Sequence, residues 1–322
     1  MNSALVYKYS GKNLALLIPT KDRPEKIVCL LQSILEQNVA CGRIIIVDGG
    51  ISIREVVISF AAYLPVEYYV CHPPGQIRQR NMGVALLDDS TPLVGCLDDD
   101  IVLLPNALEK MLECWNTSQQ KTAGISFNII NMSPIQHNWF KGLIGLSGPQ
   151  PGRVLKSGCN TPITCMSADT NVDWLCGGAT VWKTNILKKH NNREIQAKWA
   201  PLEDLIFSYP LGKLYTLMVC ASSQVRHEHV YDRHKRVDYY YIGKTETIWK
   251  FYFVEMHSEL SRIRFLLLQS LTLVGRLFKA VCNFQIRHLQ FALGQILGIF
   301  LGIRCLLSGR KLFDLLNEPL AD

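Results

Sequence analysis

The cysteines of this 322-residue sequence lack any regular spacing. There are eleven of them, an odd number, and no two form a Cys-x-x-Cys pair. Several, such as Cys96 and Cys220, lie within apolar runs. Proteins with a disulfide framework or a structural zinc site usually have paired, regularly spaced cysteines. Their absence predicts reduced, buried thiols in a cytosolic protein and gives no indication of structural zinc.

Long apolar runs are also absent. A bilayer-spanning helix needs about 20 apolar residues, whereas the segment 289–303 is uncharged for only 15 residues and is flanked by basic ones. The N-terminal residues contain no basic region followed by an apolar stretch, so we expect no secretory signal. These features favour helices that lie at the membrane surface over helices that cross it.

Acidic residues are scarce toward the C-terminus. From Arg262 onward there are eight Lys or Arg and three Asp or Glu, so this segment holds +5 of the net charge of +7. Such charge attracts anionic lipid, and it is not combined with a recognisable nucleic-acid module. We therefore predict peripheral attachment to the inner face of the cell membrane and no nucleic-acid partner. Gly294, Gly298 and Gly302 permit close helix approach, so a helical subdomain packed on the core or a homodimer contact is the alternative.

Three consecutive aspartates, Asp98, Asp99 and Asp100, end the apolar run 92–97. The run predicts a buried strand, and three carboxylates at its end repel one another unless a cation joins them. Mg²⁺ and Mn²⁺ take hard oxygen ligands of this kind. Alternation along a strand places Asp98 and Asp100 on one face and Asp99 on the other. The alternative is an acidic turn that caps a helix beginning near Pro105.

Apolar runs and helical patterns alternate through the first third of the chain. We expect strands at 13–19, 43–47, 66–70 and 92–97 and helices from 24, over roughly 52–63, and from 75. The stretch 118–168 is richer in Gly, Pro, Asn and Ser, and the chain from 245 to about 313 is helical in pattern. The alternation predicts an α/β fold with an open, mostly parallel sheet, whose ligands bind at the carboxyl ends of the strands. Thr20, Asp48 and Asp98 all fall at such ends.

Taken in order, six motifs of this chain resemble those of the family 2 glycosyltransferases, over about Leu14 to Tyr241. They are Ile18-Pro19-Thr20-Lys21-Asp22-Arg23, Asp48-Gly49-Gly50, Arg80-Asn81-Met82-Gly83, Asp98-Asp99-Asp100, Trp174-Leu175-Cys176-Gly177-Gly178-Ala179 and Glu203-Asp204. The resemblance implies the GT-A fold, which is Rossmann-like with flanking helices. We expect this catalytic domain over 1–240, with a nucleotide-sugar half to about 117 and an acceptor half over 118–240, followed by a helical, membrane-associating region over 241–322.

The resemblance also implies a nucleotide-diphosphate sugar donor and its ligands. Asp98 and Asp100 would hold Mn²⁺ or Mg²⁺, completed by His227 or His229, between which the sequence does not choose. The donor would contact Pro19, Thr20, Arg23, Asp48, Arg78, Arg80, Asn81, Asp98 and Asp99. Guanidinium groups match phosphate oxygens. An ordinary solvated helix face is the alternative for each of the two arginines, more so for Arg78 than for Arg80.

On the acceptor side the resemblance implies a catalytic base, Asp204 with Glu203 as the alternate, that removes a proton from a sugar hydroxyl. Without the family context, two carboxylates at a helix N-terminus would simply favour the helix dipole. Trp174, Gly177 and Gly178 are the expected acceptor residues, and a buried core tryptophan is the alternative for Trp174.

The function that the resemblance implies is inverting hexosyl transfer to a saccharide or lipid-linked saccharide in cell-surface polysaccharide synthesis of the bacterial type. Two departures weaken the match: Gly49 stands where a second acid is frequent, and the segment 196–201 lacks the usual Phe-Asp. A sugar-phosphate nucleotidyltransferase, which releases pyrophosphate, and a non-catalytic sugar- or membrane-binding relative remain the alternatives.

Overall fold

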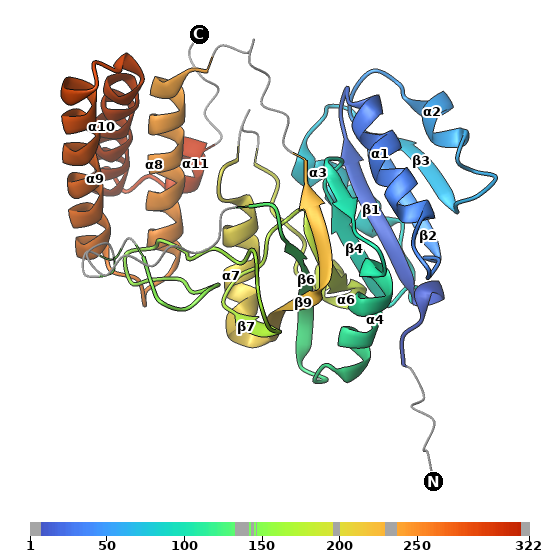
Figure 1. Ribbon diagram of the computed structural model, residues 1–322. Helices are drawn as coiled ribbons and strands as arrows, with labels where there is room; N and C mark the ends of the chain where they lie inside the picture. Colours follow the sequence, from blue (N-terminus) through green and yellow to red (C-terminus); the bar gives the residue numbers. More distant parts are fainter. Residues whose placement is uncertain are drawn as a thin grey trace. The chain divides into compact units, whose positions relative to one another are not determined.

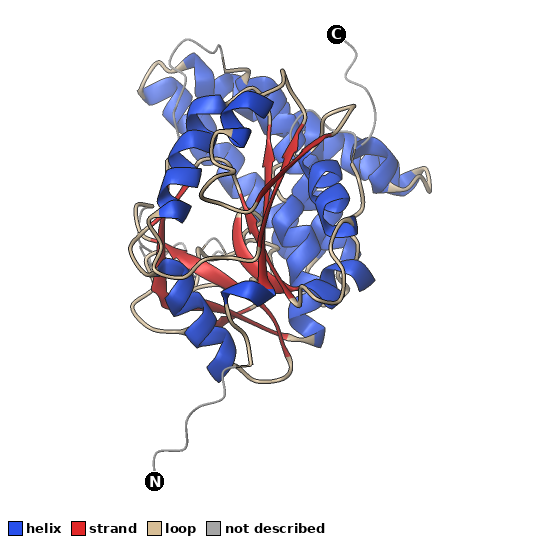
Figure 2. Cartoon of the chain, turned by 90° about the vertical axis from the view of Figure 1, so that its right-hand side faces the viewer, coloured by secondary structure: helices blue, strands red, loops and turns tan. Residues whose placement is uncertain are grey.

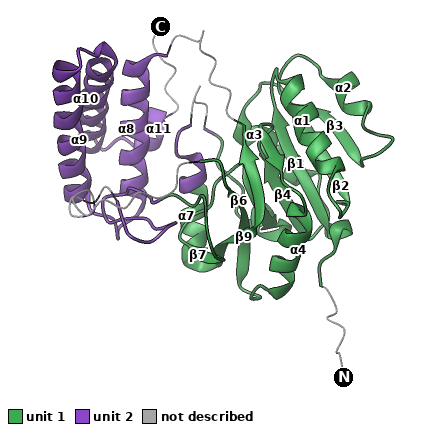
Figure 3. Ribbon diagram, in the orientation of Figure 1, with its two compact units in different colours: residues 1–135, 162–194, 207–229 green, residues 136–161, 195–206, 230–322 purple. Residues whose placement is uncertain are grey.

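The structure, a computed structural model, describes residues 8–132, 142, 145, 147–195, 200–228 and 237–316. The chain forms two compact units, which Figure 3 colours separately. Unit 1 comprises Met1–Ile135, Pro162–Glu194 and Phe207–His229, and unit 2 comprises Gln136–Thr161, Ile195–Ile206 and Val230–Asp322. The functional division at residue 240 stays a prediction.

Unit 1 is built on one β-sheet (Figure 1). Among the described residues, this sheet has nine strands. Their order across the sheet is β3-β2-β1-β4-β8-β6-β9-β5, and β7 pairs with β9. The strands are β1 (Leu14–Thr20), β2 (Arg43–Asp48), β3 (Val66–Val70), β4 (Leu93–Leu97), β5 (Ile101–Leu103), β6 (Thr122–Ile129), β7 (Thr170–Val172), β8 (Ala179–Lys183) and β9 (Thr216–His227). The four strands expected in the first third of the chain are confirmed.

The sheet changes character beyond β4. Strands β3, β2, β1 and β4 are parallel neighbours, as the strand–helix alternation predicts. Strand β8 then runs antiparallel between β4 and β6, so the sheet is mixed rather than mostly parallel. The antiparallel register pairs Leu97 with Ala179. It therefore brings the segment before β8 to the carboxyl end of β4, where the aspartates lie.

The helices that begin within or flank unit 1 cover both faces of its sheet (helices are blue and strands red in Figure 2). They are η1 (Gly11–Asn13), α1 (Pro24–Leu35), α2 (Arg54–Ile58), α3 (Gln76–Ala85), α4 (Ala107–Thr117), α6 (Thr184–Lys189) and α7 (Glu203–Leu214). The expected helix over 52–63 is shorter, because after Ile58 the chain tightens into turns in which the Ala61 N–H donates to the Ile58 carbonyl.

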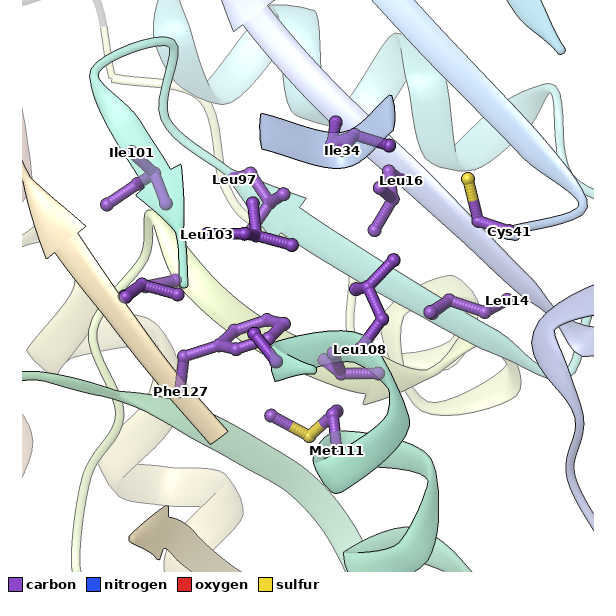
Figure 4. Close-up of a cluster of buried hydrophobic side chains, with 14 of the residues drawn as sticks. Leu14, Leu16, Ile34, Cys41, Leu97, Ile101, Leu103, Leu108, Met111 and Phe127 are labelled. Atoms are coloured by element: carbon purple, nitrogen blue, oxygen red, sulfur yellow. The ribbon is translucent and has the colours of Figure 1, made fainter. Parts of the chain in front are cut away.

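Alternation along β1 decides which helix packs on which face. Leu14 and Leu16 point to the core shared with Ile34 of α1 and Met111 of α4, all fully or almost fully buried (Figure 4). Leu17 points to the other face, where a Cβ on Gly83 of α3 would lie 2.0 Å from a Leu17 methyl group. Glycine at this position lets α3 approach the sheet, which places its N-terminal end beside the carboxyl ends of the strands.

Unit 2 contains the helical region that the pattern after residue 245 predicts. Its helices are α8 (Tyr239–Met256), α9 (Arg262–Cys282), α10 (Ile286–Leu307) and α11 (Leu312–Leu316). The expected close approach at Gly294, Gly298 and Gly302 is present: a Cβ on Gly294 would lie 2.0 Å from the Tyr240 carbonyl oxygen of α8. The glycine face of α10 is therefore covered within the chain and is not available to a second copy.

Candidate active site

The three aspartates form the turn that follows β4. The strand ends at Leu97, and the Ile101 N–H donates to the Asp98 carbonyl at 3.1 Å, which closes a four-residue turn before β5. Strand alternation therefore does not separate the three side chains. The turn separates them instead, and each carboxylate meets a different set of partners.

Asp98, Asp100 and His227 come together at this turn. Each offers one ligand atom, and the three atoms all lie within 4.8 Å of one another. His227 is the last residue of β9, whose pairing with β5 sets Ile101 opposite it. Its Nε2 lies 2.9 Å from Asp100 Oδ1, and this hydrogen bond raises the pKa of His227 against the opposing effect of burial. His229, the alternative ligand, lies outside the described residues.

This donor set fits a divalent cation. Two carboxylates and one imidazole are hard or borderline ligands of the kind that Mn²⁺ and Mg²⁺ accept, with sites left for water and phosphate oxygens. The ligands come from a tight turn and from a strand more than 120 residues later, so local helix capping does not account for their convergence.

Two arginines of the predicted set lie against the aspartate turn. The Arg80 guanidinium contacts Asp98 Oδ1 at 2.7 Å and is largely buried. Arg23 contacts Asp99 Oδ1 at 2.9 Å and Asp100 Oδ2 at 3.6 Å, while 57% of its side chain stays exposed. Paired guanidinium groups hold the carboxylates in place, and the exposed part of Arg23 is able to meet an anionic ligand.

The other two polar residues predicted on α3 have different partners. Arg78 forms an ion pair with Glu194 at 2.9 Å, and the Asn81 side-chain amide donates to the Asn192 carbonyl at 2.7 Å. Both therefore hold α3 against the segment after α6. Their predicted contact with the donor stays a prediction.

Asp99 binds the end of β1 rather than the Asp98–Asp100–His227 cluster. Its Oδ2 accepts from the Thr20 hydroxyl at 2.8 Å, and its Oδ1 accepts from Arg23. Burial raises the pKa of Asp99, partly offset by the charge of Arg23 and the Thr20 hydrogen bond. Asp99 thus ties the Pro19-Thr20 end of β1 to the turn.

Asp48 is buried at the end of β2, and only 1% of its surface is exposed. Its carboxylate accepts from the Gly50 N–H at 2.8 Å and from the Tyr68 hydroxyl at 2.6 Å. Tyr68 was not predicted from the sequence, because only the pairing of β2 with β3 brings it beside Asp48. The Arg54 guanidinium lies over the Tyr68 ring, 6.0 Å from its centroid.

Gln79 is a second residue that the sequence did not single out. Its side-chain amide donates to the carbonyls of Thr20 at 2.8 Å and Val47 at 2.7 Å, and the side chain is almost wholly buried. It joins the carboxyl ends of β1 and β2 from α3. The sequence signal that could have identified Gln79 is its place next to Arg80 on a helix that is otherwise expected to pack on the sheet.

Gly177 and Gly178 lie beside Arg80 and Asp98. A Cβ on Gly178 would lie 1.9 Å from Asp98 Oδ2, and one on Gly177 would lie 2.9 Å from Arg80 Nη1. Glycine at both positions therefore leaves room for the Asp98–Arg80 pair. Trp174 is 92% buried, which leaves little ring surface for an acceptor. The predicted acceptor roles of these residues stay predictions.

Glu203 and Asp204 are the first two residues of α7, half-buried and in unit 2. Asp204 Oδ1 accepts from the Leu205 N–H at 2.7 Å. The aspartate turn belongs to unit 1. Both interpretations, catalytic base and helix N-terminal carboxylate, are compatible with this position.

The strand order, the aspartate turn and its basic surroundings agree with a comparison of the sequence with protein families. Residues 15–167 match the family model described as Glycosyl transferase family 2. This segment is a glycosyltransferase family 2 domain. No curated protein matches the sequence.

Solved structures resemble this chain in fold at low sequence identity. Staphylococcus aureus TarS 1–349 is 12% identical with a TM-score of 0.52, over 79% of this chain and 70% of that one. GalNAc-T7 with UDP, GalNAc and Mn²⁺ is 13% identical with a TM-score of 0.53, over 74% and 50%. The mannosyltransferase PcManGT from Pyrobaculum calidifontis, in complex with GDP-Man and Mn²⁺, is 11% identical with a TM-score of 0.53, over 94% and 82%. These likenesses show the GT-A fold.

Proposed function

We propose that this glycosyltransferase transfers a hexosyl group from a nucleoside-diphosphate sugar, with inversion, to a hydroxyl of a saccharide or lipid-linked saccharide in cell-surface polysaccharide synthesis. The observation that carries the proposal is the convergence of Asp98, Asp100 and His227 beside Arg23 and Arg80. The nucleotide-bound neighbours of the same fold support a nucleotide-sugar donor.

The chemistry of the leaving group explains why this cluster is useful. When the sugar leaves the donor, negative charge develops on the nucleoside diphosphate. A divalent cation bound by Asp98, Asp100 and His227 would supply positive charge to the diphosphate oxygens. Arg23, which is held by Asp99 and remains exposed, is placed to bind a phosphate oxygen.

The ends of β1 and β2 are the proposed site for the nucleoside. Asp48 is oriented by Gly50 and Tyr68, and Gln79 fixes the carbonyls of Thr20 and Val47. A loop whose backbone and carboxylate are both held in this way loses little conformational entropy when it binds a ribose or a base. Pro19, Thr20 and Asp48 are the residues that we assign to this part of the donor.

The acceptor hydroxyl needs a base, because a neutral alcohol is a poor nucleophile. We assign this role to Asp204, with Glu203 as the alternate, because the Glu-Asp pair follows the other motifs in the order that the family resemblance implies for the base. A single attack by the acceptor on the anomeric carbon inverts its configuration.

The test is a thermal-shift screen of nucleoside diphosphates with and without Mn²⁺. We expect a rise in Tm with at least one nucleotide that requires the cation and disappears in Asp100→Ala. Asp88→Ala, an exposed aspartate away from the turn, is the matched control and should respond like wild type. No shift with any nucleotide would overturn the proposal. Release of pyrophosphate from a nucleoside triphosphate and a sugar phosphate would favour the nucleotidyltransferase.

We also propose that α9 and α10 attach the protein to the cytoplasmic surface of a membrane. Both helices are long and apolar enough to cross a membrane, so the expectation that they are too short to span it is wrong. Within the described residues, 17% of the most apolar stretch of α9 and 39% of that of α10 are buried. Large apolar side chains are exposed along both at three- and four-residue spacing: Ile263, Leu267, Leu271, Val274, Phe278 and Val281 on α9, and Leu289, Leu293, Ile296, Phe300, Ile303 and Leu307 on α10.

Charge placement favours helices that lie in the membrane surface. Arg262 and Arg304 are near one end of the helix pair, and Lys279 and Arg287 are near the connection between α9 and α10. A spanning hairpin would carry basic residues to the far side of the membrane, against the usual bias toward the cytoplasm. Helices lying in the interface keep both basic ends in contact with anionic lipid.

Co-sedimentation with vesicles tests this attachment. The triple variant Leu267→Gln, Val274→Gln and Phe278→Gln should bind vesicles that contain phosphatidylglycerol at least about tenfold more weakly, because three exposed apolar side chains are lost. The matched control replaces Ile51, Tyr63 and Val70, which are exposed on unit 1, by Gln. Equal binding by the two triple variants would contradict the proposal.

A further inference from the structure

Three potential metal ligands meet in unit 1 away from the aspartate turn. They are Cys114 of α4, Asp169 in the segment before β7, and Cys220 of β9. Their sulfur and carboxylate oxygen atoms all lie within 4.8 Å of one another. In the described part of the chain, this thiol cluster and the Asp98–Asp100–His227 cluster are the groups of three His, Cys, Asp or Glu ligands this close together.

One sulfur–oxygen separation in the thiol cluster is close to the edge of a tetrahedral metal site. Cys114 Sγ lies 3.9 Å from Asp169 Oδ2. A tetrahedral zinc ion, with Zn–S of about 2.3 Å and Zn–O of about 2.1 Å, requires a sulfur–oxygen separation of about 3.6 Å. The observed sulfur–oxygen distance is thus only a few tenths of an ångström longer than the distance that a bound zinc ion requires.

The sheet orients the carboxylate toward the thiols. The antiparallel register of β7 with β9 pairs Thr170 with Val219, so the next position sets Asp169 opposite Cys220. Asp169 Oδ1 accepts from the Ala221 N–H at 2.8 Å, which leaves Oδ2 for the two sulfur atoms. A hydrogen bond to the outer oxygen of a ligand carboxylate is the usual means by which a protein fixes a metal ligand.

The cluster is reachable from solvent at one side only. Cys114 and Cys220 are buried, at 6% and 1% exposed, whereas Asp169 is exposed. An ion is therefore able to enter past the carboxylate, with water in the fourth position, while the thiols stay protected from bulk solvent. Two sulfur ligands select Zn²⁺ and other thiophilic ions over Mg²⁺ and Mn²⁺, which prefer oxygen.

We propose that Cys114, Asp169 and Cys220 form a binding site for a thiophilic divalent cation of the Zn²⁺ class, separate from the donor site. Binding of the ion forms two metal–sulfur bonds and one metal–oxygen bond, and the two thiols release their protons to solvent. The ion links α4, β9 and the segment before β7, which the sequence separates by more than 50 residues at each step. This proposal does not depend on the donor or the acceptor.

Cadmium titration of the reduced full-length protein is the test, because thiolate–Cd²⁺ charge transfer absorbs in the ultraviolet. Cys29→Ser together with Cys282→Ser removes the two exposed thiols and gives the background for all variants. In that background we expect one equivalent of the absorption, which Zn²⁺ displaces. Cys114→Ser and Cys220→Ser should abolish it, and Asp169→Asn should weaken the binding about tenfold or more.

The controls separate a real site from a loss of folding. Asp169 is exposed, so Asp169→Asn should keep the wild-type circular dichroism spectrum and Tm in the absence of metal. Cys96→Ser, which removes a buried thiol from β4, should leave the absorption unchanged. Absence of the absorption in the background protein, its persistence in Cys220→Ser, or an unchanged affinity in Asp169→Asn would each overturn the proposed site.

Discussion

Strand β9 contributes to two ligand clusters of opposite chemistry. At its carboxyl end His227 meets Asp98 and Asp100, and seven residues earlier Cys220 meets Cys114 and Asp169. At about 3.3 Å per residue the two clusters are roughly 20 Å apart along the strand. The first is rich in carboxylates and is bordered by arginines, whereas the second has two buried thiols. The neighbours across the sheet, and not the strand itself, therefore decide which ion a position suits.

The largest expected effect that separates the two clusters is that of Asp100→Ala. This substitution removes a proposed metal ligand, which is also the hydrogen-bond partner of His227. Sugar transfer should therefore fall by at least about 100-fold. The rate is measured as nucleoside diphosphate release with Mn²⁺, and Cd²⁺ absorption at the thiol cluster should be unchanged. Asp169→Asn should give the opposite result, with near-normal transfer and weakened Cd²⁺ binding. Loss of both properties in either variant would show that the clusters are not independent.

Gly178→Ala should have the next largest effect. It affects the Asp98–Asp100–His227 cluster because an added Cβ would collide with Asp98. The new Cβ would lie 1.9 Å from Asp98 Oδ2, so the carboxylate has to leave its position. We expect Mn²⁺ affinity, measured by calorimetry, to fall about tenfold or more. Gly177→Ala is the matched neighbour and should cost less, because it meets the movable end of Arg80. A larger effect at Gly177 would contradict this account of the turn.

Asp99→Ala should reduce transfer less than Asp100→Ala, by about tenfold. Asp99 holds Thr20 and Arg23 but belongs to neither ligand cluster, so its loss loosens the donor site without removing a metal ligand. Mn²⁺ affinity should therefore stay within about twofold of wild type while KM for the donor rises. If Asp99→Ala were the more damaging of the two, the roles assigned to the turn would be reversed.

The smallest effect on transfer is expected from Cys220→Ser. The substitution replaces a buried sulfur by the smaller oxygen of a hydroxyl, so the free energy of unfolding should fall by about 1 kcal/mol. Transfer at 25 °C without thiophilic ions should stay within about twofold of wild type, while Cd²⁺ absorption is lost. The two measurements are made on the same preparation. A large loss of transfer with normal folding would link Cys220 to the donor site.

Much of the first third of the chain was predictable because its signals are local. The apolar run 14–18, Pro24 at the first turn of α1 and the acids at strand ends depend on short-range chemistry and on the parallel alternation of strands and helices. Local patterns failed where the chain tightened into turns after Ile58 and where β8 reversed direction. In both places, packing and strand pairing decided what the sequence pattern left open.

The residue types at the strand ends, the family match of residues 15–167 and the apolar, basic character of the last helices are all readable from the amino-acid sequence. The partners of these residues are not, because they depend on how the strands pair. Hydrogen bonding across strands set Tyr68 beside Asp48, His227 beside Asp100 and Asp169 beside Cys220. The physical reason is that sheet register joins residues far apart in the chain, and no spacing within the sequence records which strand will lie next to which.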